Sequence, residues 1–181
     1  MTLPRPTAKI THPLSREQFV AQALLDYESS LIGYATTLLK DLDLARDVVQ
    51  DTFIRLCEQE PTKVEDCLKS WLFTVCRNRA LDLLRKGKRN QTLDEILLEN
   101  ISDPGLQPDQ QIDQHERMAE LMSYLDRLSD NQREVIILKF QQDLSYQEIQ
   151  KITGLKAGNI GFLIHSGLKR LRDWLPDDLC L

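Results

Sequence analysis

LDRLSDNQREVIILKFQQDLSYQEIQKITGLKAGNIGFLIHSGLKRLRDW, residues 125–174, is the stretch that decides the fold, because it predicts helices joined by tight turns. Ser145 followed by Glu148 forms a capping box, the reciprocal pairing of side chains and backbone that begins a helix. Ile149 and Ile152 give that helix a buried side, and Gly154 ends it. The pattern predicts the first helix of a helix-turn-helix.

A second helix is predicted directly after this turn. Its apolar residues fall at successive steps of three and four, which places them on one side. They are Ile160, Leu163, Ile164, Leu168 and Leu171. The outer side carries Gly158, Gly161, Phe162, His165 and Lys169. Such a helix can lie in the major groove of DNA. Any two short helices joined by a glycine turn share this pattern, so the rest of the chain has to decide between DNA binding and a purely structural role.

The composition is that of a globular protein. The chain has 181 residues and a mass of 21.0 kDa, which is enough for one domain or two small ones. No run approaches the roughly 18 apolar residues that a membrane span requires. The first 13 residues, MTLPRPTAKITHP, lack the apolar core of a signal peptide. We therefore expect a cytoplasmic protein.

Catalytic and metal-binding motifs are missing from the sequence. The four cysteines share no CxxC spacing, and the three histidines stand far from them. Cys57 and Cys76 fall within apolar helical patterns, so we expect both to be buried as small apolar residues. The sequence contains no glycine-rich phosphate loop, HExxH or GxSxG motif. We predict no metal, no cofactor and no enzymatic activity.

The net charge of -5 is distributed unevenly along the chain. Residues 69–90 carry a net charge of +6 and residues 151–174 carry +4, whereas residues 91–120 carry -7. Basic segments supply the sequence-independent attraction to phosphates that nucleic-acid binding needs, and the acidic remainder limits indiscriminate binding. The alternative is that these segments are merely solvated charged faces.

Helical periodicity is nearly unbroken from Ser15 to about Lys86, and it begins with a second capping box, Ser15 with Gln18. Residues 90–115 are polar and acidic and contain two prolines and a glycine, which is typical of a tether. We therefore predict an all-α fold of two small helical bundles joined by a flexible acidic linker.

One helix of the first bundle, within DLDLARDVVQDTFIRL at residues 41–56, has two distinct sides. The predicted inner side holds Ala45, Val48, Val49, Thr52, Phe53 and Leu56. The outer side holds Asp47, Gln50, Asp51 and Ile54, and it is uniform enough to be a docking face for a partner. The competing interpretation is a solvated acidic stripe.

A later segment, SWLFTVCRNRALDLLRKGKRN at residues 70–90, predicts a helix with Ser70 as N-cap and Gly87 as terminator. We expect Trp71 to belong to the core. The outer side includes Arg77, Asn78 and Arg85, and further basic residues follow from Lys86 onward. This polar stripe suits a nucleic-acid backbone or an unpaired strand, with Asn78 able to hydrogen-bond a base edge.

Together these motifs resemble bacterial sigma factors of the sigma-70 class, specifically the compact extracytoplasmic-function (ECF) type that keeps only regions 2 and 4. The resemblance covers residues 15–175. DLARDVVQDTFIRL is similar to the region 2.2 helix that binds the beta-prime clamp of RNA polymerase. SWLFTVCRNRALDLLRK is similar to regions 2.3 and 2.4, which open and read the -10 element. LSDNQREVIILKFQQDLSYQEIQKITGL resembles region 4, which docks on the beta flap and reads the -35 element.

The resemblance implies a domain organisation and a function. Region 2 would span residues 14–90, the acidic linker residues 91–115 and region 4 residues 116–175. The chain would bind core RNA polymerase and direct initiation at specific promoters, and an anti-sigma factor is a further partner of this family. The clamp contacts would be Asp47, Gln50, Asp51 and Ile54. The -10 contacts would be Arg77, Asn78, Arg85 and Lys86, and the -35 contacts Lys156, Asn159, Phe162, His165, Lys169 and Arg170.

The chain departs from the family pattern in the second helix of the helix-turn-helix. Lys156 stands at the cap, where a hydroxyl residue is usual, and Gly161 and Leu163 stand where basic residues are common. Two other classes compete with the sigma factor: a response-regulator activator, whose receiver domain would alternate strands with helices, and an interaction protein such as a polymerase decoy or an anti-sigma factor.

Overall fold

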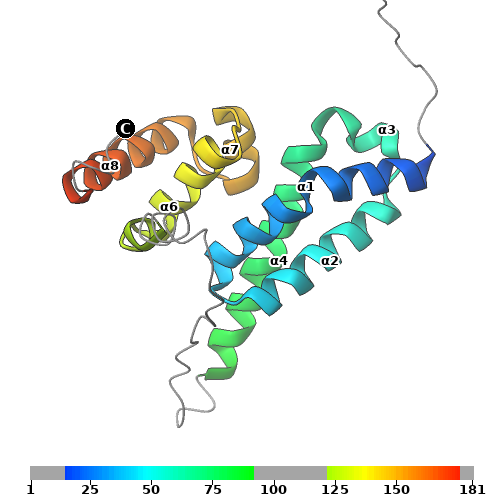
Figure 1. The fold of residues 1–181 in the computed structure, drawn as a ribbon, viewed down its shortest axis with the longest axis horizontal. Helices are drawn as coiled ribbons and strands as arrows, with labels where there is room; N and C mark the ends of the chain where they lie inside the picture. The colour runs from blue at the N-terminus through cyan, green and yellow to red at the C-terminus, as the bar shows by residue number, and fades with distance from the viewer. Residues whose placement is uncertain (1–14, 92–121, 176–181) are drawn as a thin grey trace, which may run out of the picture.

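The computed structural model describes residues 15–91 and 122–175, and this part of the chain contains helices and no strands (Figure 1). The first bundle consists of α1 (Arg16–Leu39), α2 (Leu42–Glu58), α3 (Pro61–Val64), the 3-10 turn η1 (Glu65–Cys67) and α4 (Leu68–Gln91). The second contains a helical segment at residues 122–126, α6 (Asp130–Ile136), the π-helical turn η2 (Ile137–Gln141), α7 (Tyr146–Thr153) and α8 (Ala157–Trp174). The predicted all-α fold is confirmed.

The first two helices begin where their caps predict. The Ser15 hydroxyl accepts from the backbone N–H of Gln18 at 3.3 Å, and the Gln18 side chain accepts from the backbone of Ser15 at 3.0 Å, which completes the capping box. Asp41 caps α2 through the backbone N–H of Leu44. The side of α2 expected to face inward is buried in full, namely Ala45, Val48, Val49, Thr52, Phe53 and Leu56.

The start and end of α4 differ from the sequence prediction. Ser70 is not an N-cap, because η1 runs directly into α4 and the helix already begins at Leu68. The Ser70 hydroxyl lies within the first turn of α4 and donates to the carbonyl of Cys67. Gly87 does not end α4, which continues to Gln91. A glycine inside a helix costs only about 1 kcal/mol relative to alanine, so neighbouring turns can carry it. The segment between Glu58 and Lys69 contains α3 and η1.

The helix-turn-helix forms from the predicted signals. Ser145 and Glu148 make the capping box of α7, and Gly154 ends that helix in the left-handed conformation with φ of 74°. The hydrogen bond from the Ser145 side chain, followed by that from its backbone, lowers the pKa of Glu148. Ile149 and Ile152 are buried as expected.

A close contact between α8 and α6 explains one wrong assignment in α8. Leu168 was expected inside but is 40% exposed, and its neighbour Gly167 lies buried against α6 instead. A Cβ atom at Gly167 would lie 2.7 Å from Cδ1 of Ile136, so a larger residue here would force the Ile136 side chain to move. Gly167 therefore takes the buried place on α8 that the sequence pattern assigned to Leu168.

The two bundles pack against each other. α4 contacts α7 and α1 contacts α6, as Figure 1 shows. One continuous hydrophobic core includes Leu31, Tyr34 and Phe73 of the first bundle and Leu138 and Ile149 of the second. Residues 92–121 lie outside the described residues. They include all of the expected linker after Gln91 and the first residues of the expected second domain.

The described cysteines divide into two kinds. Cys76 is fully buried, and burial raises the pKa of its thiol to about 12, so it stays protonated as a small apolar group. Cys57 is exposed, which corrects the expectation of burial, because it lies near the end of α2 beyond the last buried turn. In the described residues no group of side chains could hold a metal ion. No described helix is long and apolar enough to cross a membrane.

Candidate functional site

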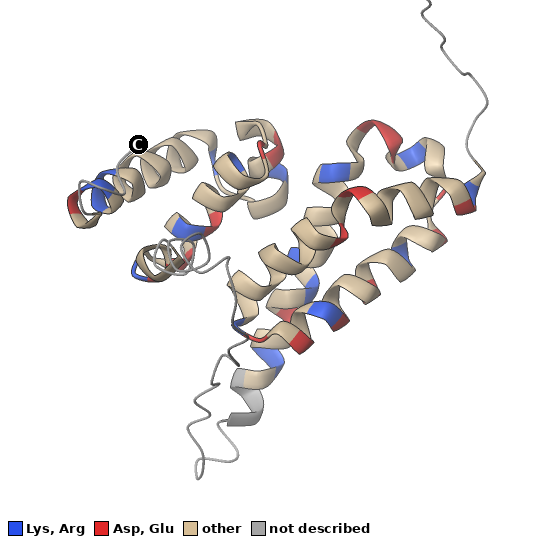
Figure 2. Cartoon of the chain, in the orientation of Figure 1, with Lys and Arg blue, Asp and Glu red and all other residues tan. Residues whose placement is uncertain are grey.

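The outer face of α8 is the first candidate surface. Its buried side is formed by Ile160, Ile164, Gly167 and Leu171, so the opposite side is free to meet a ligand. The six residues expected to contact DNA here are all exposed: Lys156, Asn159, Phe162, His165, Lys169 and Arg170. Figure 2 shows basic positions gathered on the second half of this helix.

Phe162 is the most exposed large apolar residue of this face, at 67%. Phe162 therefore lies on the outer side, as the sequence pattern predicts, and is not part of the core. Lys156 stands at the N-cap without a capping hydrogen bond from its side chain, in agreement with the departure noticed in the sequence. The face therefore combines polar, basic and apolar groups, which suits contacts with both phosphates and base edges.

The orientation of α8 is fixed by Gln132 at the beginning of α6. Its side-chain nitrogen donates to the Ser166 hydroxyl at 2.9 Å, and its side-chain oxygen accepts from Arg170 at 3.1 Å. Arg170, although exposed, is thus already engaged within the protein. Sequence reasoning did not single out Gln132, because its partners lie 34 and 38 residues away.

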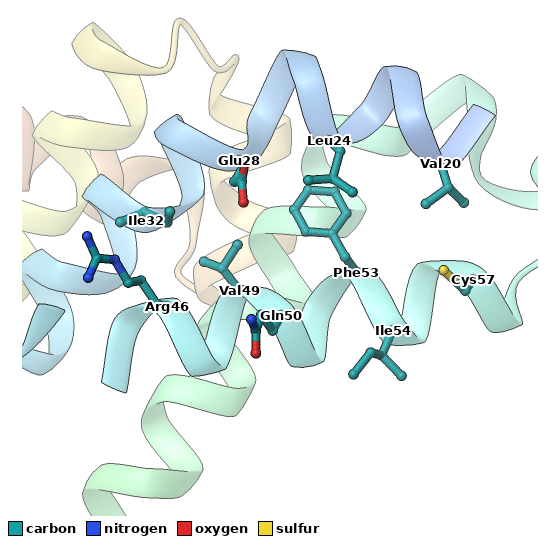
Figure 3. A pocket seen from close by; sticks show the side chains of 10 residues that line it. All are labelled: Val20, Leu24, Glu28, Ile32, Arg46, Val49, Gln50, Phe53, Ile54 and Cys57. Atoms are coloured by element: carbon teal, nitrogen blue, oxygen red, sulfur yellow. The ribbon is translucent and has the colours of Figure 1, made fainter. Parts of the chain in front are cut away.

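The second candidate surface is the groove between α1 and α2. It has a volume of about 510 Å³ and an apolar floor. Figure 3 shows Val49 and Phe53 pointing toward α1, while Gln50 and Ile54 point away from it along the rim. Ile54 is 59% exposed and extends the apolar lining of the groove to its rim. The lining residues are Val20, Leu24, Glu28, Ile32, Arg46, Val49, Gln50, Phe53, Ile54 and Cys57.

The four predicted docking residues of α2 do not all share one environment. Asp47, Gln50 and Ile54 are exposed, and the latter two line the groove. Asp51 is half-buried and forms an ion pair with Arg79 of α4, with 2.7 Å between Asp51 Oδ2 and Arg79 Nε. Asp51 therefore faces the rest of the bundle more than its neighbours do.

The polar stripe of α4 is the third candidate surface. Asn78, Arg85 and Lys86 are exposed, and Arg85 pairs with Asp82 one turn away. Arg77 is different, because its side chain is only 16% exposed and points into the junction between the bundles. The expectation that Arg77 lies on an open outer face is therefore wrong for this conformation, since a partner from the second bundle covers it.

That partner is Glu134 of α6, whose side chain is 5% exposed. Arg77 donates from Nε to Glu134 Oε1 at 2.6 Å and from Nη2 to Oε2 at 3.1 Å, a bidentate pair. The Tyr34 hydroxyl donates to the same Oε1 at 2.6 Å. Arg77 and Tyr34 lie 57 and 100 residues away from Glu134 in the sequence, so no local sequence pattern could indicate this contact.

The pKa values follow from burial and from the shared carboxylate. Burial raises the pKa of Tyr34 well above its usual value, and the negative charge of Glu134 raises it further. Burial alone would lower the pKa of Arg77, but the hydrogen bonds and charge of Glu134 outweigh it and raise the pKa overall. Both groups therefore keep their protons, and the cluster consists of one cation, one anion and one neutral donor.

Comparisons with known proteins cover the same two bundles. Residues 24–90 match the family model described as Sigma-70 region 2, and residues 118–171 match Sigma-70, region 4. The ECF RNA polymerase sigma factor SigX of Bacillus subtilis is 32% identical over 160 residues, which cover 83% of this chain and 81% of SigX. SigM of the same organism is 29% identical over 147 residues, covering 81% and 88% of the two chains.

A solved structure is similar over most of the chain. It is the sigma factor RpoE in complex with the anti-sigma factor NepR from Bartonella quintana, with 28% sequence identity and a TM-score of 0.63. The match covers 84% of this chain and 94% of that one, so both bundles take part in it.

Proposed function

We propose a set of molecular contacts for this chain, which belongs to the extracytoplasmic-function sigma factors of the sigma-70 family. As a member of that family it binds core RNA polymerase and directs promoter-specific transcription initiation. The observation that carries this conclusion is the presence of region 2 and region 4, in that order, in one helical chain. The proposed domains are residues 14–90, 91–115 and 116–175.

The groove between α1 and α2 is the proposed contact with the polymerase clamp. Gln50 and Ile54 stand on its rim, Asp47 is exposed on the same helix, and the apolar floor offers area to bury. An apolar floor inside a polar rim is the arrangement of a protein–protein interface. Asp51 contributes mainly by holding Arg79 in place, given its ion pair.

The proposed -10 contacts lie along α4. Asn78 is available for a base edge, and Arg85 and Lys86 are available for phosphates of an unpaired strand. Arg77 joins them only when its pair with Glu134 is broken. The proposed -35 contacts are the exposed residues of α8, with Asn159 and Phe162 as the base-reading pair and Lys156, Lys169 and Arg170 as phosphate anchors.

The competing protein classes have less support from the structure. A response-regulator activator requires a receiver domain of alternating strands and helices, and residues 15–91 contain helices without a strand. The sigma factors are initiation factors, and we propose that this one likewise has no enzymatic activity of its own, needs no cofactor and works in the cytoplasm with its polymerase. Regulation by an anti-sigma factor is proposed from the similar RpoE, which was solved with one.

The decisive experiment is in vitro transcription with core RNA polymerase over a library of genomic promoters, with start sites mapped. We expect the chain to co-purify with core enzyme and to produce a restricted set of start sites. A chain that binds core enzyme without any initiation would instead be a decoy, and a chain that fails to bind core enzyme would contradict the proposed contacts altogether.

A further inference from the structure

The junction between the bundles buries a cluster that belongs to neither domain alone. Glu134 of region 4 accepts two hydrogen bonds from Arg77 and one from Tyr34 of region 2. Two further links flank it, from Lys69 to the carbonyl of Gln142 and from Lys40 to Asp126. These five polar contacts and the shared core hold region 4 against region 2.

This closed arrangement cannot read a whole promoter. Elements about 25 base pairs apart are separated by roughly 85 Å along B-form DNA, at 3.4 Å per base pair. In the closed chain α4, which carries the proposed -10 contacts, packs directly against α7 of the helix-turn-helix. The two regions must therefore separate before both elements are bound.

The same closure occupies a proposed DNA-binding group. A carboxylate that accepts both arms of a guanidinium presents the same charge and the same paired oxygens as a DNA phosphate. With its side chain only 16% exposed and its Nε and Nη2 bound to Glu134, Arg77 is not free to reach a phosphate while the chain is closed. Opening of the chain and release of Arg77 are thus one event.

We propose that Glu134 is an internal competitor of promoter DNA for Arg77, so that the free chain is autoinhibited until region 4 moves away from region 2. The proposal rests on the proposed -10 role of Arg77. Tyr34 strengthens the closed state because its hydroxyl satisfies the same buried carboxylate and its ring packs on Phe73, with 5.2 Å between ring centroids. When one partner of a buried ion pair is removed, the other is left uncompensated, so the closed state should lose its advantage.

The test uses the full-length chain without polymerase and a single-stranded oligonucleotide that carries the non-template -10 sequence of a mapped promoter. Glu134→Gln removes the charge but keeps an acceptor for Tyr34. We expect it to bind the oligonucleotide about fivefold or more tightly than wild type and to show a larger radius of gyration by small-angle X-ray scattering. Tyr34→Phe should change both quantities in the same direction by less.

Two controls separate this effect from a simple change of charge. Asp130→Asn removes one negative charge from the same helix at a side chain that is 94% exposed, and it should leave both quantities unchanged. Adding Arg77→Ala to Glu134→Gln should abolish the gain in oligonucleotide affinity. Circular dichroism verifies that each variant is folded, and Tyr34→Phe serves as the test if Glu134→Gln is not.

The outcomes distinguish this proposal from the proposed function. Glu134→Gln with unchanged affinity for the oligonucleotide overturns the proposal, whether or not the chain expands, and so does a gain that persists without Arg77. Initiation by wild-type holoenzyme is scored separately, so autoinhibition can fail while the sigma-factor function stands. A gain as large with Asp130→Asn also overturns it, because charge alone would then explain the binding.

Discussion

At the scale of single residues, exposure separates the groups proposed to contact DNA from those that build the fold. Phe162 and Asn78 illustrate this on different helices, since each projects from a helix whose opposite side is fully buried. A large exposed aromatic residue contributes little to folding, and an exposed asparagine inside a helix contributes less. Both positions are therefore open to tests in which binding changes and stability does not.

Phe162→Ala should reduce discrimination at one thymine of the -35 element while leaving the melting temperature nearly unchanged. Packing against the thymine methyl group is worth about 1 to 3 kcal/mol at most, and a surface substitution usually changes stability by less than about 0.5 kcal/mol. Binding of the holoenzyme to single-base variants of the promoter measures the first quantity, and calorimetry measures the second. A lower melting temperature with unchanged base preference would refute the contact.

Asn78→Ala, or Arg85→Ala together with Lys86→Ala, should impair promoter opening more than binding to core enzyme. These side chains are exposed on α4, where they can hold the unpaired strand, and none of them lies in the α1–α2 groove. Permanganate footprinting reports the unpaired thymines, and co-purification reports core binding. Normal opening in both variants would move the -10 contacts elsewhere, for example to α3 and η1.

At the scale of helices, the contacts that matter most are close approaches between elements. The close packing of α6 on α8 involves Gly167, and the proposed partner surface of α2 is the groove that it forms with α1. Neither feature is a property of one helix. Each can be altered by a substitution that leaves the helix itself intact.

Gly167→Ala should destabilise the protein by about 1 to 2 kcal/mol, because its Cβ would lie 2.7 Å from Cδ1 of the buried Ile136 side chain and force it to move, which costs more than the about 0.5 to 1 kcal/mol that alanine gains over glycine in a helix. Gly161→Ala is the matched control. A Cβ at Gly161 meets nothing within 4 Å, so alanine should stabilise the same helix by about 0.5 to 1 kcal/mol. Urea denaturation of both variants measures the difference, and equal effects would contradict the close packing.

Asp47→Lys together with Gln50→Lys should lower affinity for core polymerase by roughly tenfold or more through unfavourable charge at the clamp contact. Asp51 is left unchanged, because a lysine there would meet Arg79 and could disturb the fold. Thr62→Lys with Asp66→Lys adds the same charge at exposed positions away from the groove and should leave core affinity unchanged. Affinity within a few-fold of wild type for the α2 variant would rule out this surface.

Much of the helical structure could be predicted from the sequence, because helix caps and the buried faces of helices depend on residues close together in the sequence. Both capping boxes that the sequence predicts form, and the inner side of α2 is buried residue for residue. Leu168 and Gly87 could not be placed correctly, since the first depends on how α8 meets α6 and the second on helical turns that continue past a tolerated glycine. The position of Arg77 depends on a glutamate in the other bundle, and periodicity carries no information about such a partner.

At the scale of the whole molecule, the two bundles should unfold together because they share a continuous core. Trp71 lies in the first bundle and Trp174 in the second, so Trp174→Phe and Trp71→Phe each leave one reporter. In each variant we expect the urea midpoint from tryptophan fluorescence to coincide with the midpoint from circular dichroism. Separate midpoints would show that the bundles are independent and that the contact between them adds little stability.

The junction also sets how this chain is free to evolve. Arg77 binds a carboxylate within the protein and, in the proposed function, a phosphate outside it, and both partners favour a planar group with paired donors. Lysine would suit neither partner fully. Glu134 takes part only in the contact within the protein, so it can vary once another residue holds the two bundles together. Among related chains the arginine should therefore be the slower of the two to vary, and where the glutamate is replaced, substitutions at Tyr34 should accompany it.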